Sequence, residues 1–196
     1  WLPGYPLHAL CGMETAGWMD FAAEYLDHAL DIPGAETEAL CEIARQFQVD
    51  LVMGVAERDP ITRGSIYSTL LVIDSEGELA GRHRKLRPAV NERALLADGD
   101  AAGLQVFERD YGVISALAGV EHQMVLPTYA LAEQGAQFHV AAWPGGEIAG
   151  IATSARQHLL ARAFAAQAGA YVLCAGGILS REDAPEPYRH FLRAPL

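Results

Sequence analysis

Apolar and polar positions follow two periods along the chain, one typical of helices and one typical of buried strands. A period near 3.6 predicts amphipathic helices over residues 19–30 and 36–47. Further helices are expected over residues 124–134 and over the alanine-rich residues 152–168. Short apolar runs between polar or glycine-containing turns predict strands over residues 51–55, 66–74, 79–85, 104–108, 113–118, 138–142 and 171–175. This alternation, with a hairpin turn at residues 75–78, indicates an α/β sandwich with mixed sheets.

Composition and charge narrow the class of protein. With 51% hydrophobic residues, residues 1–196 are expected to form a single domain with a sizeable core. The net charge of −11 argues against nucleic acid and anionic membranes as partners, because both attract basic surfaces. The three cysteines have no disulfide or zinc spacing, which favours a cytoplasmic setting. The most apolar stretch, residues 159–179, is interrupted by Arg162 and Gln167, so no membrane span and no leader peptide are expected.

Unusual polar groups gather where predicted strands end, which is where α/β folds bind ligands. The candidate residues are Lys85, Glu92, Glu121, His122, Trp143 and Pro144. A lysine with a nearby carboxylate can polarise a substrate or move a proton, but the same residues could form an ion-pair network. Glu121 and His122 suit an anion site or ordinary helix capping. Trp143 and Pro144 could wall a pocket or cover the core.

Neither a metal nor a cofactor is expected from the sequence. The seven histidines are scattered, and no phosphate-binding glycine loop or metal-ligand spacing stands out. From the residues alone, the chain is an acidic α/β protein with a polar site at its strand ends.

Six sequence blocks, in this order and spacing, resemble the nitrilase branch of the carbon–nitrogen hydrolase (nitrilase) family. They are Trp1–Pro6, Met53–Asp59, Gly64–Tyr67, Arg84–Pro88 followed by Glu92-Arg93, Gly119–His122 and His139–Gly145. The resemblance covers nearly the whole chain. It implies a nitrilase-like α-β-β-α sandwich that is incomplete at both termini.

The resemblance also implies a reaction and a set of roles. The family hydrolyses a nitrile to a carboxylic acid and ammonia through a cysteine thioimidate. By position, Lys85 is the catalytic lysine, Glu92 the supporting glutamate and Gly119 the nucleophile position. The substrate-binding positions would be Val120, Glu121, His122, Trp143 and Pro144, with the Val120 N–H stabilising developing charge.

Several positions depart from the family pattern. Gly119 has no side chain to act as nucleophile, Val120 replaces a pocket tryptophan, and Ala89-Val90 replace Thr-His. The family's first catalytic glutamate is expected just before Trp1, outside this chain. Loss of the nucleophile predicts that the chain is catalytically inactive as written.

Three readings stay open. The chain could be a natural homologue retained for assembly or ligand binding, a truncated or engineered form of an active nitrilase, or an enzyme using Lys85 and Glu92 for other chemistry. The expected partners are a small-molecule nitrile, amide or carboxylate and further copies of the chain. The helix over residues 124–134 carries more apolar surface than a lone surface helix needs, which fits either a contact for dimers or larger spirals or burial in the monomer core.

Overall fold

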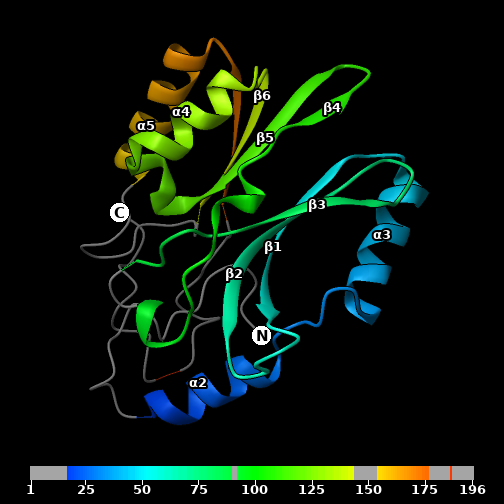
Figure 1. Ribbon diagram of the computed structural model, residues 1–196, viewed down its shortest axis with the longest axis vertical. Coiled ribbons are helices and arrows are strands. Elements are labelled where there is room, and N and C mark those ends of the chain that lie inside the picture. The colour runs from blue at the N-terminus through cyan, green and yellow to red at the C-terminus, as the bar shows by residue number, and fades with distance from the viewer. Residues whose placement is uncertain (1–16, 90–91, 144–153, 177–185, 187–196) are drawn as a thin grey trace.

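Two β-sheets lie face to face between outer helices in the computed structural model (Figure 1). The structure describes residues 17–89, 92–143, 154–176 and 186. This is the α-β-β-α sandwich implied by the sequence.

The first sheet is an antiparallel meander. It contains β1 (Leu51–Arg58), β2 (Ile66–Ile73) and β3 (Leu79–Arg84), in that spatial order. The predicted hairpin joins β2 to β3, where Gly77 adopts a φ of 79° that other residues rarely take. Helices α2 (Trp18–Asp27) and α3 (Ala35–Phe47) lie on this side of the molecule (Figure 1).

The second sheet contains the order β4 (Phe107–Arg109), β5 (Gly112–Ala118), β6 (Phe138–Trp143) and β7 (Tyr171–Gly176). Strands β4 and β5 are antiparallel, whereas β5, β6 and β7 are parallel. The two parallel connections carry the helices α4 (Val125–Glu133) and α5 (Ser154–Ala168), as a parallel sheet requires. Three short 3-10 helices, η1 (Glu92–Ala94), η2 (Ala101–Gly103) and η3 (Gly119–Gln123), complete the described elements.

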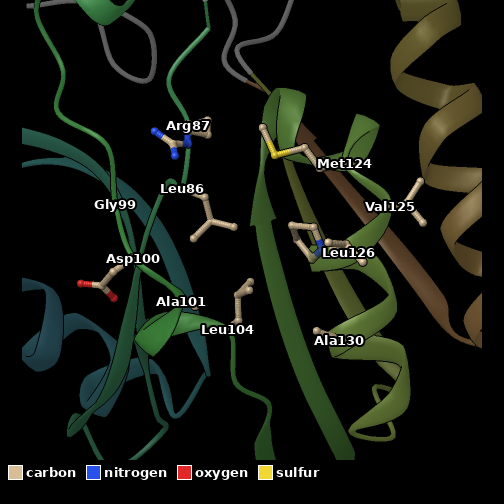
Figure 2. Close-up of a pocket in the computed structure, with 11 residues that line it drawn as sticks. Leu86, Arg87, Gly99, Asp100, Ala101, Leu104, Met124, Val125, Leu126 and Ala130 are labelled. Atoms are coloured by element: carbon tan, nitrogen blue, oxygen red, sulfur yellow. The ribbon is translucent and has the colours of Figure 1, made fainter.

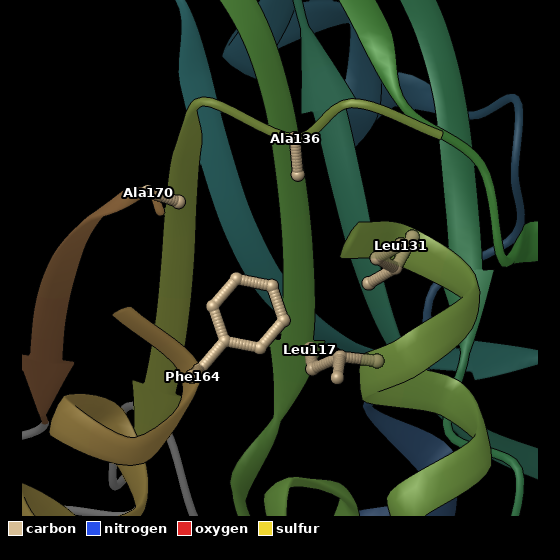
Figure 3. Close-up of a cluster of buried hydrophobic side chains, with 5 residues drawn as sticks. All are labelled: Leu117, Leu131, Ala136, Phe164 and Ala170. Atoms are coloured by element: carbon tan, nitrogen blue, oxygen red, sulfur yellow. The ribbon is translucent and has the colours of Figure 1, made fainter. Parts of the chain in front are cut away.

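Alternation along the strands divides the core into layers. Leu70 packs with Ala116 and Ala118 between the sheets, while its neighbour Leu71 packs with Ala44 of α3 on the other face. On the outer face of the second sheet, buried side chains lie between the strands and helices α4 and α5 (Figure 3); they are Leu117, Leu131, Ala136, Phe164 and Ala170.

The predicted elements are present, with shifted ends. The first predicted helix ends at Asp27 rather than residue 30, because Leu30 forms a parallel bridge with Glu57 of β1. Strand β1 correspondingly continues to Arg58, so the polar residues predicted as a loop are part of the strand. The strand predicted at residues 104–108 is Phe107–Arg109. The part of the 152–168 helix before Ser154 lies outside the described residues.

Candidate functional site

Lys85 and Glu92 form a buried ion pair directly after strand β3. The Lys85 Nζ lies 3.0 and 2.8 Å from the two Glu92 carboxylate oxygens, and the residues are only 4% and 2% exposed. The Lys85 N–H donates to the Ser68 carbonyl of β2, and the Gly99 N–H donates to the Lys85 carbonyl. A Cβ at residue 99 would collide with the backbone of residues 84 and 85, so this close support requires glycine. Backbone hydrogen bonds therefore fix both the N–H and the carbonyl of Lys85.

Two further groups contact or face the Glu92 carboxylate. The Ala89 N–H donates to Glu92 Oε2. Burial raises the pKa of Tyr25, and the nearby negative charge of Glu92 adds to that effect. Tyr25 belongs to α2, so this helix lies near Glu92.

Glu121 connects the end of β3 to the end of β5. Its Oε1 accepts from the Leu86 N–H at 2.8 Å, and its Oε2 accepts from the Ala118 N–H at 3.0 Å. The His83 Nε2 lies 3.0 Å from both oxygens. Burial opposes ionisation of this fully buried carboxylate, but the hydrogen bonds and charge from His83 and the two amides outweigh it, so the pKa of Glu121 lies below its ordinary value. Glu121 thus fixes the residue after Lys85 against the residue before Gly119.

Gly119 occupies a sharp turn from β5 into η3. Its φ of 51° lies in the left-handed region, where a side chain is strained and glycine is not. The residue is buried, whereas Val120 is half-buried. This strand-to-turn geometry is the arrangement expected for an elbow that presents a reactive residue.

His122 and His139 are stacked between aromatic rings behind this turn. The His122 Nδ1 lies 2.8 Å from the Gly119 carbonyl oxygen, and its Nε2 lies 3.0 Å from His139 Nε2. His139 Nδ1 lies 2.7 Å from Ser115 Oγ. Trp143 stacks on His122 with ring centroids 4.7 Å apart, and Phe164 stacks on His139 at 3.9 Å.

Burial lowers the pKa of both imidazoles. The pKa of His122 falls below its ordinary value because burial outweighs its bond to the Gly119 carbonyl and the charge of Glu121. Burial and the adjacent His122 lower the pKa of His139 to about 3. Both rings are therefore neutral at physiological pH.

The arginines of β3 belong to a separate network. Glu57 of β1 is fully buried and pairs with Arg82 at 2.7 Å and with Arg84, and its Oε2 accepts from the Thr69 hydroxyl at 2.7 Å. Hydrogen bonding to Glu57 raises the pKa of Arg84. The arginines of β3 are thus directed to Glu57, whereas the neighbouring Lys85 is directed to Glu92.

A shallow groove of about 620 Å³ lies beyond the lysine, between η2 and α4 (Figure 2). Leu86, Leu104 and Met124 line it, and Val125 and Leu126 of α4 form part of its wall. The groove does not include Lys85 or Glu92, so it is distinct from the ion-paired site.

The structure brings most of the predicted site residues together. Lys85 contacts Glu92, Gly119 to His122 form one turn, and Trp143 stacks on His122. Pro144 lies outside the described residues. Glu121 is fully buried with both oxygens bonded to protein groups, so it holds the site together and offers no free oxygen to a ligand.

Sequence reasoning missed His83, Ser115 and His139 as members of this cluster. The available signal was polar residues inside otherwise apolar strands, and Ser115 and His139 are register partners on neighbouring strands. Within the described ranges, no group of three or more His, Cys, Asp or Glu side chains could hold a metal ion. No helix in those same ranges is long and apolar enough to cross a membrane.

The fold and this site define an α-β-β-α protein with a buried lysine–glutamate pair beside a strand-to-helix elbow. The sequence profile of the carbon–nitrogen hydrolase family matches residues 1–190, and the chain belongs to this family. It is 50% identical over 182 residues to Nitrilase 2 from an unknown prokaryotic organism, covering 91% of this chain and 54% of that protein. It is 32% identical over 186 residues to an aliphatic nitrilase from Rhodococcus rhodochrous, covering 92% of this chain and 50% of that protein.

Solved structures share the fold. Saccharomyces cerevisiae Nit3, a member of branch 10 of the nitrilase superfamily, superposes with a TM-score of 0.70 at 22% identity, covering 80% of this chain and 57% of that one. A carbon–nitrogen hydrolase from Helicobacter pylori G27 gives a TM-score of 0.66 at 17% identity, covering 86% and 56%. The chain spans about half the length of the curated relatives it matches.

Proposed function

We propose that this nitrilase-family chain binds small nitriles, amides or carboxylates beside Lys85 but does not hydrolyse nitriles as it stands. The observation that carries the proposal is the buried Lys85–Glu92 pair, joined through Glu121 to the turn at Gly119. The family reaction forms a thioimidate by attack of a cysteine thiolate on the nitrile carbon. Gly119 offers no thiol at the position where the family pattern has this nucleophile.

The ion pair leaves Lys85 able to bind a ligand. An ammonium group has three N–H donors, and the Glu92 carboxylate accepts at most two of them. The remaining N–H would donate to a carboxylate, amide or nitrile. Because Glu92 neutralises much of the lysine charge, the site would favour short ligands that make a directed hydrogen bond over highly charged anions.

The two cysteines in the described residues are poorly placed to replace the missing nucleophile. Cys41 lies on α3, and burial raises the pKa of its thiol, which disfavours the reactive thiolate. Cys174 lies on the exposed side of β7, two strands from β5. Neither belongs to the cluster that surrounds Gly119.

Ammonia release from a panel of aliphatic and aromatic nitriles tests the inactive state. The chain as written should release no more ammonia than a protein-free blank. Turnover above the blank that a thiol reagent abolishes would overturn the proposal. Gly119→Cys is the matched variant for the thiol, and thioimidate formation with a nitrile can be followed by intact-mass spectrometry even if hydrolysis is incomplete.

Calorimetric titration with acetate and butyrate tests the binding half of the proposal. Millimolar affinity is expected, reduced at least tenfold in Lys85→Met. Glu92→Gln is the second variant, because it keeps a hydrogen-bond acceptor while releasing the lysine charge, and it should bind carboxylates more tightly. Unchanged affinity in both variants would exclude Lys85 as the binding group.

Self-association is a second proposal and rests on a different observation. Val125, Leu126 and Tyr129 of α4 are 77%, 78% and 64% exposed, and together they form the α4 patch. Exposed apolar side chains gathered on one helix are typical of a protein–protein contact. A second copy of the chain is the proposed partner, as the family resemblance implies.

A further inference from the structure

The interior behind the Gly119 turn holds a row of polar side chains that the proposed ligand binding beside Lys85 does not use. Ser115 of β5 and His139 of β6 are fully buried, and His122 of η3 is 6% exposed. Each contacts the next, and the row ends at the carbonyl oxygen of Gly119. Polar groups this deep are costly unless every one is paired, so their hydrogen-bonding directions can be assigned.

The donor and acceptor of each bond follow from the carbonyl end. A carbonyl oxygen only accepts, so His122 Nδ1 carries the proton. A neutral His122 then has an unprotonated Nε2, which accepts from His139 Nε2–H. A neutral His139 has an unprotonated Nδ1, which accepts from the Ser115 hydroxyl. Burial of two adjacent imidazoles keeps both neutral, because a charge on either ring would be poorly solvated there.

We propose that Ser115, His139 and His122 are positioning residues that form one directional hydrogen-bond chain, which fixes the peptide group between Gly119 and Val120. The carbonyl held by His122 and the N–H of Val120 belong to this same planar peptide group and point in opposite directions. Holding the carbonyl therefore sets the direction of the N–H. Donation to the carbonyl also polarises the peptide and strengthens its N–H as a donor.

Aromatic stacking keeps the two rings in this orientation. Trp143 covers His122 with an interplanar angle of 30°, and Phe164 covers His139 at 21°. The His122 and His139 rings themselves meet edge to face, at 73°. Rings clamped in this way cannot rotate to exchange their nitrogens, so the tautomer of one ring dictates that of the other.

The relevance of Val120 to a ligand rests on the proposed function, whereas the hydrogen-bond chain does not. The two ideas can therefore fail separately. If acetate leaves the Val120 amide signal unmoved while the tautomers are as assigned, Val120 is not part of the ligand site and the chain of positioning residues stands.

Nitrogen-15 NMR of histidine-labelled protein at neutral pH tests the inference directly. The expected signature is protonation of His122 on Nδ1 only and of His139 on Nε2 only, each without exchange. Both rings in the same tautomer, or His122 protonated on Nε2, would overturn the proposal. This measurement needs no variant, so it is decisive even if substitutions prevent folding.

Ser115→Ala tests the far end of the chain. Loss of the hydroxyl should give His139 a second, populated tautomer and should shift the backbone amide signal of Val120, two side chains away. Ser68→Ala on β2 is the control, because it removes a hydroxyl outside this row of side chains. A Val120 shift no larger in Ser115→Ala than in Ser68→Ala would show that the row does not position the peptide.

Discussion

At the scale of single residues, Lys85 and Glu92 depend on each other. Lys85→Met would leave the 2% exposed Glu92 carboxylate without its cation, and such an unpaired buried charge typically costs about 3–5 kcal/mol. Glu92→Gln should cost a similar amount. The double variant should lose clearly less than the sum, because no uncompensated charge remains. Urea unfolding of the four proteins measures this coupling, and additive losses would contradict it.

Replacing Gly119 is expected to destabilise the fold through backbone strain. Because its φ is 51°, Gly119→Ala should lower the free energy of unfolding by about 1–2 kcal/mol. Gly135→Ala is the matched control, since Gly135 has a φ of 85° and open space around a new Cβ. Similar losses in both variants, measured by urea unfolding, would identify strain as the cause. No loss in Gly119→Ala would show that the turn relaxes freely.

The sequence predicted the site residues that follow strand ends better than those inside the strands. The Lys85 and Glu92 spacing and the Gly119–His122 block identified residues that the structure places in adjoining clusters. The partner of His122 could not be read from spacing, because His139 reaches it across neighbouring parallel strands. Likewise, Glu121 matches a capping or an anion-site pattern equally well, and only its two backbone donors decide between them.

At the scale of elements, the histidines link the stability of β5, β6 and η3 to pH. The pKa of His139 is lowered to about 3 by burial and by His122, and burial also lowers that of His122. Glu121, on the same turn as His122, is the charged group that partly opposes the lowering of the His122 pKa. Between an unfolded pKa near 6.5 and the lower folded values, the unfolded chain binds protons that the folded chain does not.

The free energy of unfolding should therefore fall as the pH drops below about 6.5. Each histidine contributes at most about 1.4 kcal/mol per pH unit to this loss. Urea unfolding between pH 7.5 and pH 5 would measure the slope, and His139→Gln should reduce it. His28→Gln is the control, because it removes an exposed histidine that lies outside the buried pair. A slope that His139→Gln does not alter would show that this ring is not the source.

The elements themselves were predictable where one hydrophobic period dominates. Strand β2 and helix α3 match their predicted ranges closely, because β2 is buried on both faces over residues 69–73 and α3 packs Ala44 against Leu71 and Ile73 of that strand. The predicted end of β1 was wrong because Glu57 and Arg58 are polar residues of the kind that normally indicate a loop. Glu57 remains in the strand because Arg82, Arg84 and Thr69 satisfy its carboxylate across the sheet. Partners that are distant in sequence cannot be recognised from the local pattern of hydrophobic and polar residues.

At the scale of the whole molecule, helix α4 contributes an apolar patch to the outer surface of the sandwich. Helix α4 buries Leu131 against Leu117 of the second sheet, yet the α4 patch faces outward. The groove between α4 and η2 adjoins this patch, so apolar surface continues from the helix into a depression (Figure 2). A protruding apolar side chain from a partner could fill such a depression, which would add shape complementarity to the hydrophobic contact.

The last prediction concerns the assembly that this surface supports. Leu126→Lys places a charge in the middle of the α4 patch, where dimer formation would bury it, so the dissociation constant should rise at least tenfold, or about 1.4 kcal/mol. Ile61→Lys is the matched control, because Ile61 is 88% exposed on the loop between β1 and β2, outside the patch. Light scattering across a concentration series measures both variants against the unmodified chain. A dissociation constant that Leu126→Lys leaves unchanged would place the contact elsewhere, and a protein that stays monomeric at every concentration would exclude self-association through α4.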